Sequence, residues 1–134
     1  MSILLHEVNK SFPNPRTQVL TNISCEIKLG EFVSLVGRSG SGKSTLLYIM
    51  SSLDTATSGS VKIGGEEISS FTQKKLHQFR NEHMGFVFQF HNLLAELSAE
   101  ENVLMPARKK GLHHQKREYA HYLLEQFGIK DKVN

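Results

Sequence analysis

The stretch that most restricts the fold of this chain is GRSGSGKS, residues 37–44. Three glycines supply the backbone freedom that a tightly curled loop needs. An apolar run, FVSLV at residues 32–36, precedes the loop, and STLLYIMSSL, with apolar residues at helical spacing, follows it. Strand, glycine-rich loop and helix in this order predict a βα unit of a parallel sheet, with the loop at the carboxyl end of the strand, where ligands bind.

The loop matches G-x-x-x-x-G-K-[ST] at every fixed position, and each residue type has a chemical purpose. Backbone N–H groups of the curled loop point at phosphate oxygens, and the start of the next helix adds partial positive charge. Lys43 is predicted to reach the β- and γ-phosphates, and the Ser44 hydroxyl to ligate Mg²⁺. The predicted phosphate-contacting residues are Gly37, Arg38, Ser39, Gly40, Ser41, Gly42, Lys43, Ser44 and Thr45. This loop alone does not choose among kinases, GTPases and ATPases.

The patterns around this unit predict further strands. Residues 3–8, ILLHEV, form a short apolar strand candidate, and the two prolines of SFPNPRTQ mark a loop at residues 11–18. Residues 19–28 alternate apolar and polar, as in a half-buried strand, with Cys25 as a small core residue. The paired glycines of VKIGGEEIS, residues 61–69, predict a hairpin.

The second half of the chain is mainly helical by pattern. Residues 73–80 predict a short polar helix, and MGFVFQF, residues 84–90, predicts a second buried strand with Gln89 at its end. Ser98 and Glu101 form a capping box that opens the next helix.

The end of the chain predicts a last helix. Pro106 is expected to break or kink the preceding helix. Residues 114–127 form the last helix, which ends at Gly128 as a C-terminal cap. The expected buried stripe of that helix is Tyr119, Leu123, Leu124 and Phe127.

Composition excludes several classes of protein. With 39% hydrophobic and 22% charged residues in 134, the chain is expected to fold as a globular protein. The lone cysteine permits no internal disulfide, and no apolar run approaches the length of a membrane span. The net charge of +3 includes a basic end, either a solvated helical face or a docking surface, but few aromatics lie between its cations, which disfavours nucleic acid. His113, His114 and His121 share a face, but no cysteine or carboxylate completes a clear zinc set.

Three other stretches resemble the ATP-binding-cassette (ABC) ATPases that drive membrane transporters. They are VNKSFPNP, LDTATSGSVKIGGEEIS and MGFVFQ. The resemblance implies an α/β fold: a P-loop NTPase core with an antiparallel β segment, an incomplete parallel sheet and the start of a helical subdomain. Residues 1–90 correspond to the amino-terminal part of the core, and residues 91–134 to the start of the helical subdomain.

The same resemblance implies roles for two more residues. Phe12 stands where the family commonly carries an aromatic that stacks on adenine. Gln89 stands at the family's glutamine, which contacts Mg²⁺ or the attacking water. Within the family, QFHNLL and ENVLMP are most similar to the lipoprotein-releasing ATPases, followed by macrolide-exporter and cell-division ATPases.

Membership would imply an ATP-binding subunit that uses ATP and Mg²⁺, pairs with transmembrane permease subunits, forms a homodimer when complete, and lies on the cytoplasmic face of the cell membrane. Nucleic acid is not expected as a partner. The 134 residues contain no LSGGQ signature, no second acidic strand (Walker B) with a magnesium Asp and a catalytic Glu, and no switch histidine. Two readings therefore stay open: part of a transport ATPase, or a nucleotide-binding fragment without ATPase activity. Low stability of the isolated chain is expected.

Overall fold

A computed structural model describes residues 1–90 and 92–129. The chain forms two compact units, Met1–Gly85 and Phe86–Asn134. The boundary predicted from the sequence, between residues 90 and 91, lies a few residues further along. Within the described residues, no helix has both the length and the apolar character needed to cross a membrane.

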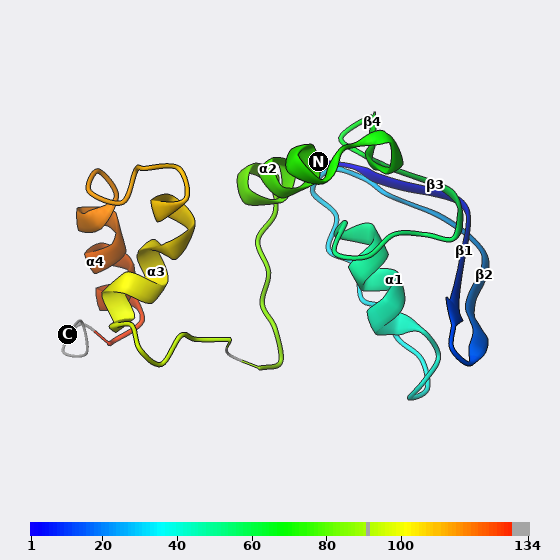
Figure 1. The fold of residues 1–134 in the computed structure, drawn as a ribbon, viewed down its shortest axis with the longest axis horizontal. Helices are drawn as coiled ribbons and strands as arrows, with labels where there is room; N and C mark the ends of the chain where they lie inside the picture. The colour runs from blue at the N-terminus through cyan, green and yellow to red at the C-terminus, as the bar shows by residue number, and fades with distance from the viewer. Residues whose placement is uncertain (91, 130–134) are drawn as a thin grey trace. The chain divides into compact units, whose positions relative to one another are not determined.

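The first unit contains a four-stranded antiparallel sheet in the order β2-β1-β3-β4 (Figure 1). Its strands are β1 (Ile3–Pro13), β2 (Arg16–Ile27), β3 (Ser58–Ile63) and β4 (Glu66–Glu67). The loop predicted at residues 11–18 is wrong, because Phe12 pairs with Thr17 and only two residues, Asn14 and Pro15, connect the strands. The hairpin predicted between β3 and β4 is confirmed, with both of its glycines at positive φ.

Local irregularities bend β1 and β2. The register shifts around Glu7 in β1, and both Glu7 and Asn22 have positive φ, 49° and 50°. Side chains of neighbouring strand residues satisfy the displaced amides: Glu7 N donates to Ser24 Oγ at 2.9 Å, and Asn22 N donates to Asn9 Oδ1 at 2.9 Å. The strands thus keep their backbone hydrogen bonding where the ladder is interrupted.

The prediction that Cys25 is a core residue is wrong. Cys25 pairs with the buried Leu5, yet it is exposed because β2 is an edge strand and the core beneath it is incomplete. Partial burial nevertheless raises the pKa of the Cys25 thiol. The raised pKa favours the neutral thiol over the reactive thiolate.

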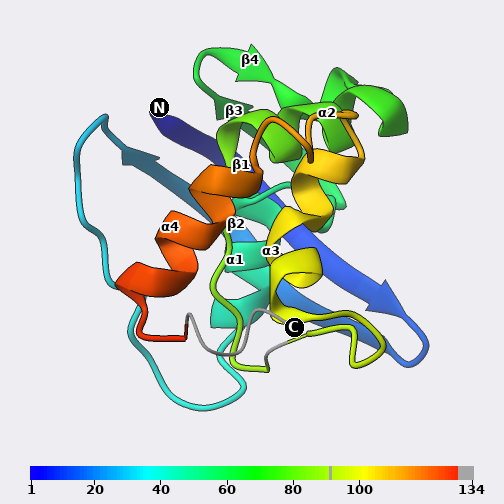
Figure 2. The ribbon, with the colours of Figure 1, turned by 90° about the vertical axis from the view of Figure 1, so that its left-hand side faces the viewer.

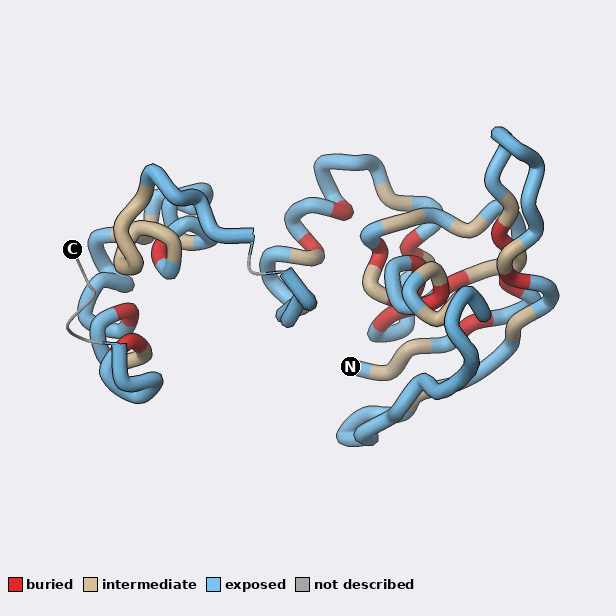
Figure 3. The backbone as a smooth tube through the Cα atoms, turned by 90° about the horizontal axis from the view of Figure 1, so that it is seen from below, coloured by how far each residue is buried: buried red, intermediate tan, exposed pale blue. Residues whose placement is uncertain are grey.

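The core of the first unit lies between the sheet and two helices, α1 (Lys43–Met50) and α2 (Gln73–His83) (Figures 2 and 3). Both helices confirm a sequence prediction, and α2 begins with the Thr72 side chain accepting a hydrogen bond from Lys75 N. Leu47 of α1 faces solvent at 54% exposure, although it belonged to the predicted apolar face. The buried apolar residues are Leu5, Val8, Leu20, Leu46, Ile49, Met50, Val61, Ile63, Ile68, Leu76 and Phe79.

The two segments predicted as buried parallel strands, residues 32–36 and 84–90, form no ladder in the described part of the chain. Phe32 and Val87 are almost completely exposed, at 99% and 103%. The physical reason is that a parallel strand is stable only when it is paired and covered on both faces. The antiparallel part of the predicted fold is therefore formed, and the incomplete parallel sheet is not.

Ser52, just after α1, carries an unfavourable combination of features. It is 5% exposed, its φ is +57°, and its Oγ has no hydrogen-bond partner within the described residues. Left-handed backbone costs a non-glycine residue about 1 kcal/mol, and a buried unsatisfied hydroxyl costs about 1–3 kcal/mol.

Ser52→Gly is expected to raise the free energy of unfolding of the first unit by about 1 kcal/mol, because both costs are removed and exceed the entropy cost of glycine. Urea unfolding measures the change. Ser51→Gly is the matched control, since Ser51 has φ −95° and should lose stability. Equal changes in the two variants would contradict the expectation.

The second unit is an antiparallel pair of helices, α3 (Ala99–Arg108) and α4 (Arg117–Gln126), which lie side by side (Figure 2). The predicted capping box of α3 is confirmed. Pro106 does not break α3, which continues to Arg108 because the proline falls in its final turn.

Helix α4 starts three residues later than predicted, and its predicted C-terminal cap is confirmed by Gly128 at φ 68°. The predicted apolar stripe is only partly correct. Ala120 and Leu124 are buried, whereas Tyr119 and Phe127 are 57% and 78% exposed. A pair of helices buries a narrower face than a helix within a larger core.

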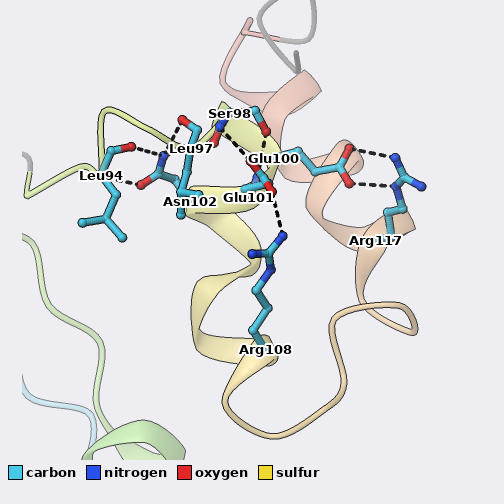
Figure 4. Close-up of polar contacts among 8 residues, drawn as sticks. All are labelled: Leu94, Leu97, Ser98, Glu100, Glu101, Asn102, Arg108 and Arg117. Carbon is cyan, nitrogen blue, oxygen red and sulfur yellow. Dashed lines mark hydrogen bonds and ion pairs between the residues drawn. The ribbon is translucent and has the colours of Figure 1, made fainter.

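Polar contacts fix the start of α3 (Figure 4). Asn102 Nδ2 donates to the carbonyls of Leu94 and Leu97 at 3.0 and 3.1 Å, and its Oδ1 accepts from Leu94 N at 2.9 Å. One side chain thus ties the segment before α3 to its first turn.

Glu100 links the two helices of the second unit. Its carboxylate lies 2.6 Å from His121 Nε2 and 2.7 Å from Arg117 Nε. The hydrogen bond with His121, followed by the contact with Arg117, lowers the pKa of Glu100.

Because the pKa of Glu100 is lower in the folded unit than in the unfolded chain, its contribution is present above the unfolded value of about 4.3 and is lost as pH falls through the folded pKa. Helix stability should therefore decrease in acid, measured as the melting temperature from circular dichroism. Glu100→Gln should flatten that pH dependence. An unchanged acid profile in this variant would contradict the role given to Glu100.

Candidate nucleotide-binding site

The lysine of the glycine-rich loop folds over the loop itself. Lys43 is the first residue of α1, and its Nζ donates to the carbonyls of Gly37 and Arg38 at 3.0 and 2.7 Å. Ser41 N donates to Arg38 O at 3.3 Å, which closes a turn inside the loop. An ammonium group has three N–H donors, so after these two bonds one donor is left for a phosphate oxygen.

The glycines of the loop are required for steric reasons. Gly42 has φ 87°, and a Cβ there would lie 2.9 Å from Leu20 Cδ2 and 3.1 Å from the carbonyl oxygen of Val19. Gly37 is equally tight, because a Cβ would lie 2.9 Å from Ser41 Oγ. The close approach of Gly42 places the start of α1 directly against β2.

The start of α1 has the electrostatics of an anion site. The first N–H groups of an α-helix have no intrahelical acceptor and carry partial positive charge. No acidic residue lies in the first turn of α1, and no side chain caps Gly42. Ser44 is exposed in this turn and Thr45 is half-buried, so the Ser44 hydroxyl is accessible as an oxygen ligand for a cation. This turn can accept negative charge and, beside it, a hard cation.

Phe12 lies in the same unit, near the tip of the β1–β2 hairpin, with 41% of its surface exposed. Lys10 Nζ lies over its ring, 5.0 Å from the centroid. Lys10 pairs across the sheet with Leu20, the residue that packs on Gly42. This chain of contacts connects Phe12 to the loop, while its stacking on adenine stays a prediction.

Lys10 itself was missed by the sequence reasoning. It is only 8% exposed, and its Nζ donates to Asp54 Oδ1 and to Thr55 O, each at 2.8 Å. A lysine in an otherwise apolar strand segment is the signal that could have drawn attention to it, because buried lysines are paired.

Gln89 is exposed at a bend in the second unit, whereas the glycine-rich loop belongs to the first. Its predicted contact with Mg²⁺ or water therefore stays a prediction. Within residues 1–90 and 92–129, no three His, Cys, Asp or Glu side chains are grouped so as to hold a metal ion. Of the three histidines that share a face in the sequence, His121 is bonded to Glu100.

A glycine-rich loop closed by its own lysine, at the start of a helix that packs on a sheet, defines the class of phosphate-loop nucleotide-binding proteins. Comparison with known families narrows the class. The family model described as ABC transporter matches residues 20–134, and the chain belongs to this family.

Several relatives are similar over nearly the whole chain. The lipoprotein-releasing system ATP-binding protein LolD of Leptospira interrogans is 48% identical over 132 residues, which are 98% of this chain and 55% of that protein. The macrolide export ATP-binding/permease protein MacB of Shigella sonnei is 43% identical over 96% of this chain and 20% of its own length. The chain thus spans about half the length of the LolD relative.

A solved structure confirms the fold class. The dimeric post-hydrolysis structure of the ATP-binding cassette MJ0796, bound to ADP and Pi, matches with a TM-score of 0.81 at 37% identity. The match covers 92% of this chain and 56% of the cassette.

Proposed function

We propose that this chain is the nucleotide-binding part of an ABC transporter ATPase and binds ATP through Gly37–Thr45. The observation that carries the proposal is the position of Lys43, whose Nζ is held over the loop by the carbonyls of Gly37 and Arg38. The ammonium group and the first N–H groups of α1 together form a positive cradle for a phosphate chain. Phe12 would supply the adenine contact.

Mg²⁺ would be held by Ser44, with Gln89 as the second candidate ligand. The exposed hydroxyl at the start of α1 fits this role, since Mg²⁺ prefers oxygen ligands and retains several waters. The ion would neutralise charge on the β- and γ-phosphates. Lys43 would orient the same phosphates from the side of the loop.

In a complete cassette, ATP hydrolysis would drive lipoprotein release or related export. The relatives named for lipoprotein release and macrolide export support this assignment, as does the cassette bound to ADP and Pi. The assembly we propose pairs two cassettes with transmembrane permease subunits on the cytoplasmic face of the cell membrane. The dimeric state of the matched cassette supports the pairing of two copies.

A second candidate function is nucleotide binding without turnover. The stretches of the family that activate water and close over the γ-phosphate do not occur among the 134 residues, which favours this reading for the chain by itself.

Steady-state phosphate release by the purified chain, compared with its Lys43→Ala variant, separates the two readings. Release at the rate of the variant, together with measurable ATP binding, supports binding alone. Release well above the variant would establish hydrolysis by this chain.

A further inference from the structure

A cavity of about 180 Å³ lies in the first unit, away from the glycine-rich loop. It is enclosed by the end of α1, β3, α2 and the short 3₁₀ helix η1 (Ile68–Ser70). Its wall is predominantly apolar. The apolar lining residues are Ile49, Ala56, Val61, Ile68 and Leu76.

Ser52 is the polar exception in this wall. It lines the cavity, is 5% exposed, and leaves its Oγ without a hydrogen bond in the part of the chain that the structure describes. The backbone cannot turn this hydroxyl away, because Ser52 N is bonded to Ile49 O at 3.0 Å. A buried hydroxyl in this state represents binding free energy that a suitable group in the cavity would release.

The other polar group of the wall, Asp54, is already compensated. Its Oδ1 accepts from Lys10 Nζ at 2.8 Å and from Thr55 N at 2.7 Å. A charged ligand would lose its hydration on entering and would find no free opposite charge among these groups. The cavity therefore favours a neutral molecule.

We propose that this cavity binds a small neutral ring compound carrying one hydroxyl group, with the ring against the apolar wall and the hydroxyl bonded to Ser52 Oγ. The size supports a single ring, because an aliphatic cavity of about 150 Å³ in another protein holds benzene. A lone water is a poorer occupant, since buried water needs about 2–4 polar partners and the wall offers the Ser52 hydroxyl among aliphatic side chains. This site goes beyond the proposed ATP function and does not depend on it.

Phenol and toluene are suitable probes, since they match in shape and differ in the hydroxyl. Each is titrated into the 134-residue chain while the methyl NMR signals of Ile49, Val61 and Ile68 are followed. Saturable shifts of these signals are expected. In Ser52→Gly, the ratio of phenol affinity to toluene affinity should fall at least about fivefold, the loss expected for one hydrogen bond.

A second variant tests the location. Ala56→Phe fills the cavity and should abolish the shifts with both probes, while methyl signals of the second unit remain unchanged as a check of folding. The proposal is overturned if neither probe shifts these signals up to its solubility limit. It is also overturned if the affinity ratio is the same in Ser52→Gly, a variant expected to be more stable than the parent chain.

Discussion

Replacing Lys43 by alanine is expected to weaken ATP binding by about 100-fold, which corresponds to the loss of roughly 3 kcal/mol of charge-assisted contacts with the phosphates. The structural reason is the placement of Nζ 3.0 and 2.7 Å from two loop carbonyls, which directs the ammonium group over the loop. Binding of a fluorescent ATP analogue, with unlabelled ATP as competitor, measures the change.

The matched control for Lys43 is Lys62→Ala. Lys62 is an exposed lysine of β3, so this variant removes the same charge from the chain without touching the loop. It should bind ATP within about twofold of the parent chain, because exposed charges several residues from a site act weakly through water. Equal losses in the two variants would show a general effect of net charge, and the loop would then not be the phosphate site.

Gly59→Ala is expected to lower the free energy of unfolding of the first unit by more than about 3 kcal/mol. Gly59 lies in β3 at φ 91°, and an added Cβ would lie 2.4 Å from Glu7 O and 2.7 Å from His6 O. Both neighbours are backbone atoms, so they cannot swing aside. Relief would require β3 to separate from the irregular part of β1.

Gly65→Ala isolates the backbone strain from the clash. Gly65 has a similar φ of 86°, yet nothing lies within 4 Å of its added Cβ. The expected loss is only about 1 kcal/mol, the cost of left-handed backbone. Urea unfolding of the two variants side by side measures the difference, and equal losses would mean that β1 and β3 are less tightly packed than the structure shows.

The features that were predictable from the sequence are those that depend on near neighbours. The capping box of Ser98 and Glu101, the glycine cap at Gly128 and the Gly-Gly hairpin all form as expected, because each is a contact within a few residues. The glycine-rich loop belongs to this group, since its motif specifies both composition and spacing.

The features that failed depend on distant parts of the chain. Pro13 ends a strand although proline suggested a loop, because cross-strand pairing of β1 with β2 extends to the hairpin tip. The apolar run at residues 32–36 lacks the neighbours that make a parallel strand. The pairing of Lys10 with Asp54 joins residues far apart in sequence, so local patterns could not reveal it.

The anchoring of α1 has a consequence for the entropy of ligand binding. Its first turn is held by the contact of Gly42 with Leu20, and the segment after its last turn is held by Lys10 through Asp54. Lys10 and Leu20 are partners in one ladder, so both ends of the helix are fastened to the same pair of strands. Most of the ordering of the helix therefore takes place when the unit folds, and little conformational entropy should remain to be lost there when a phosphate chain binds.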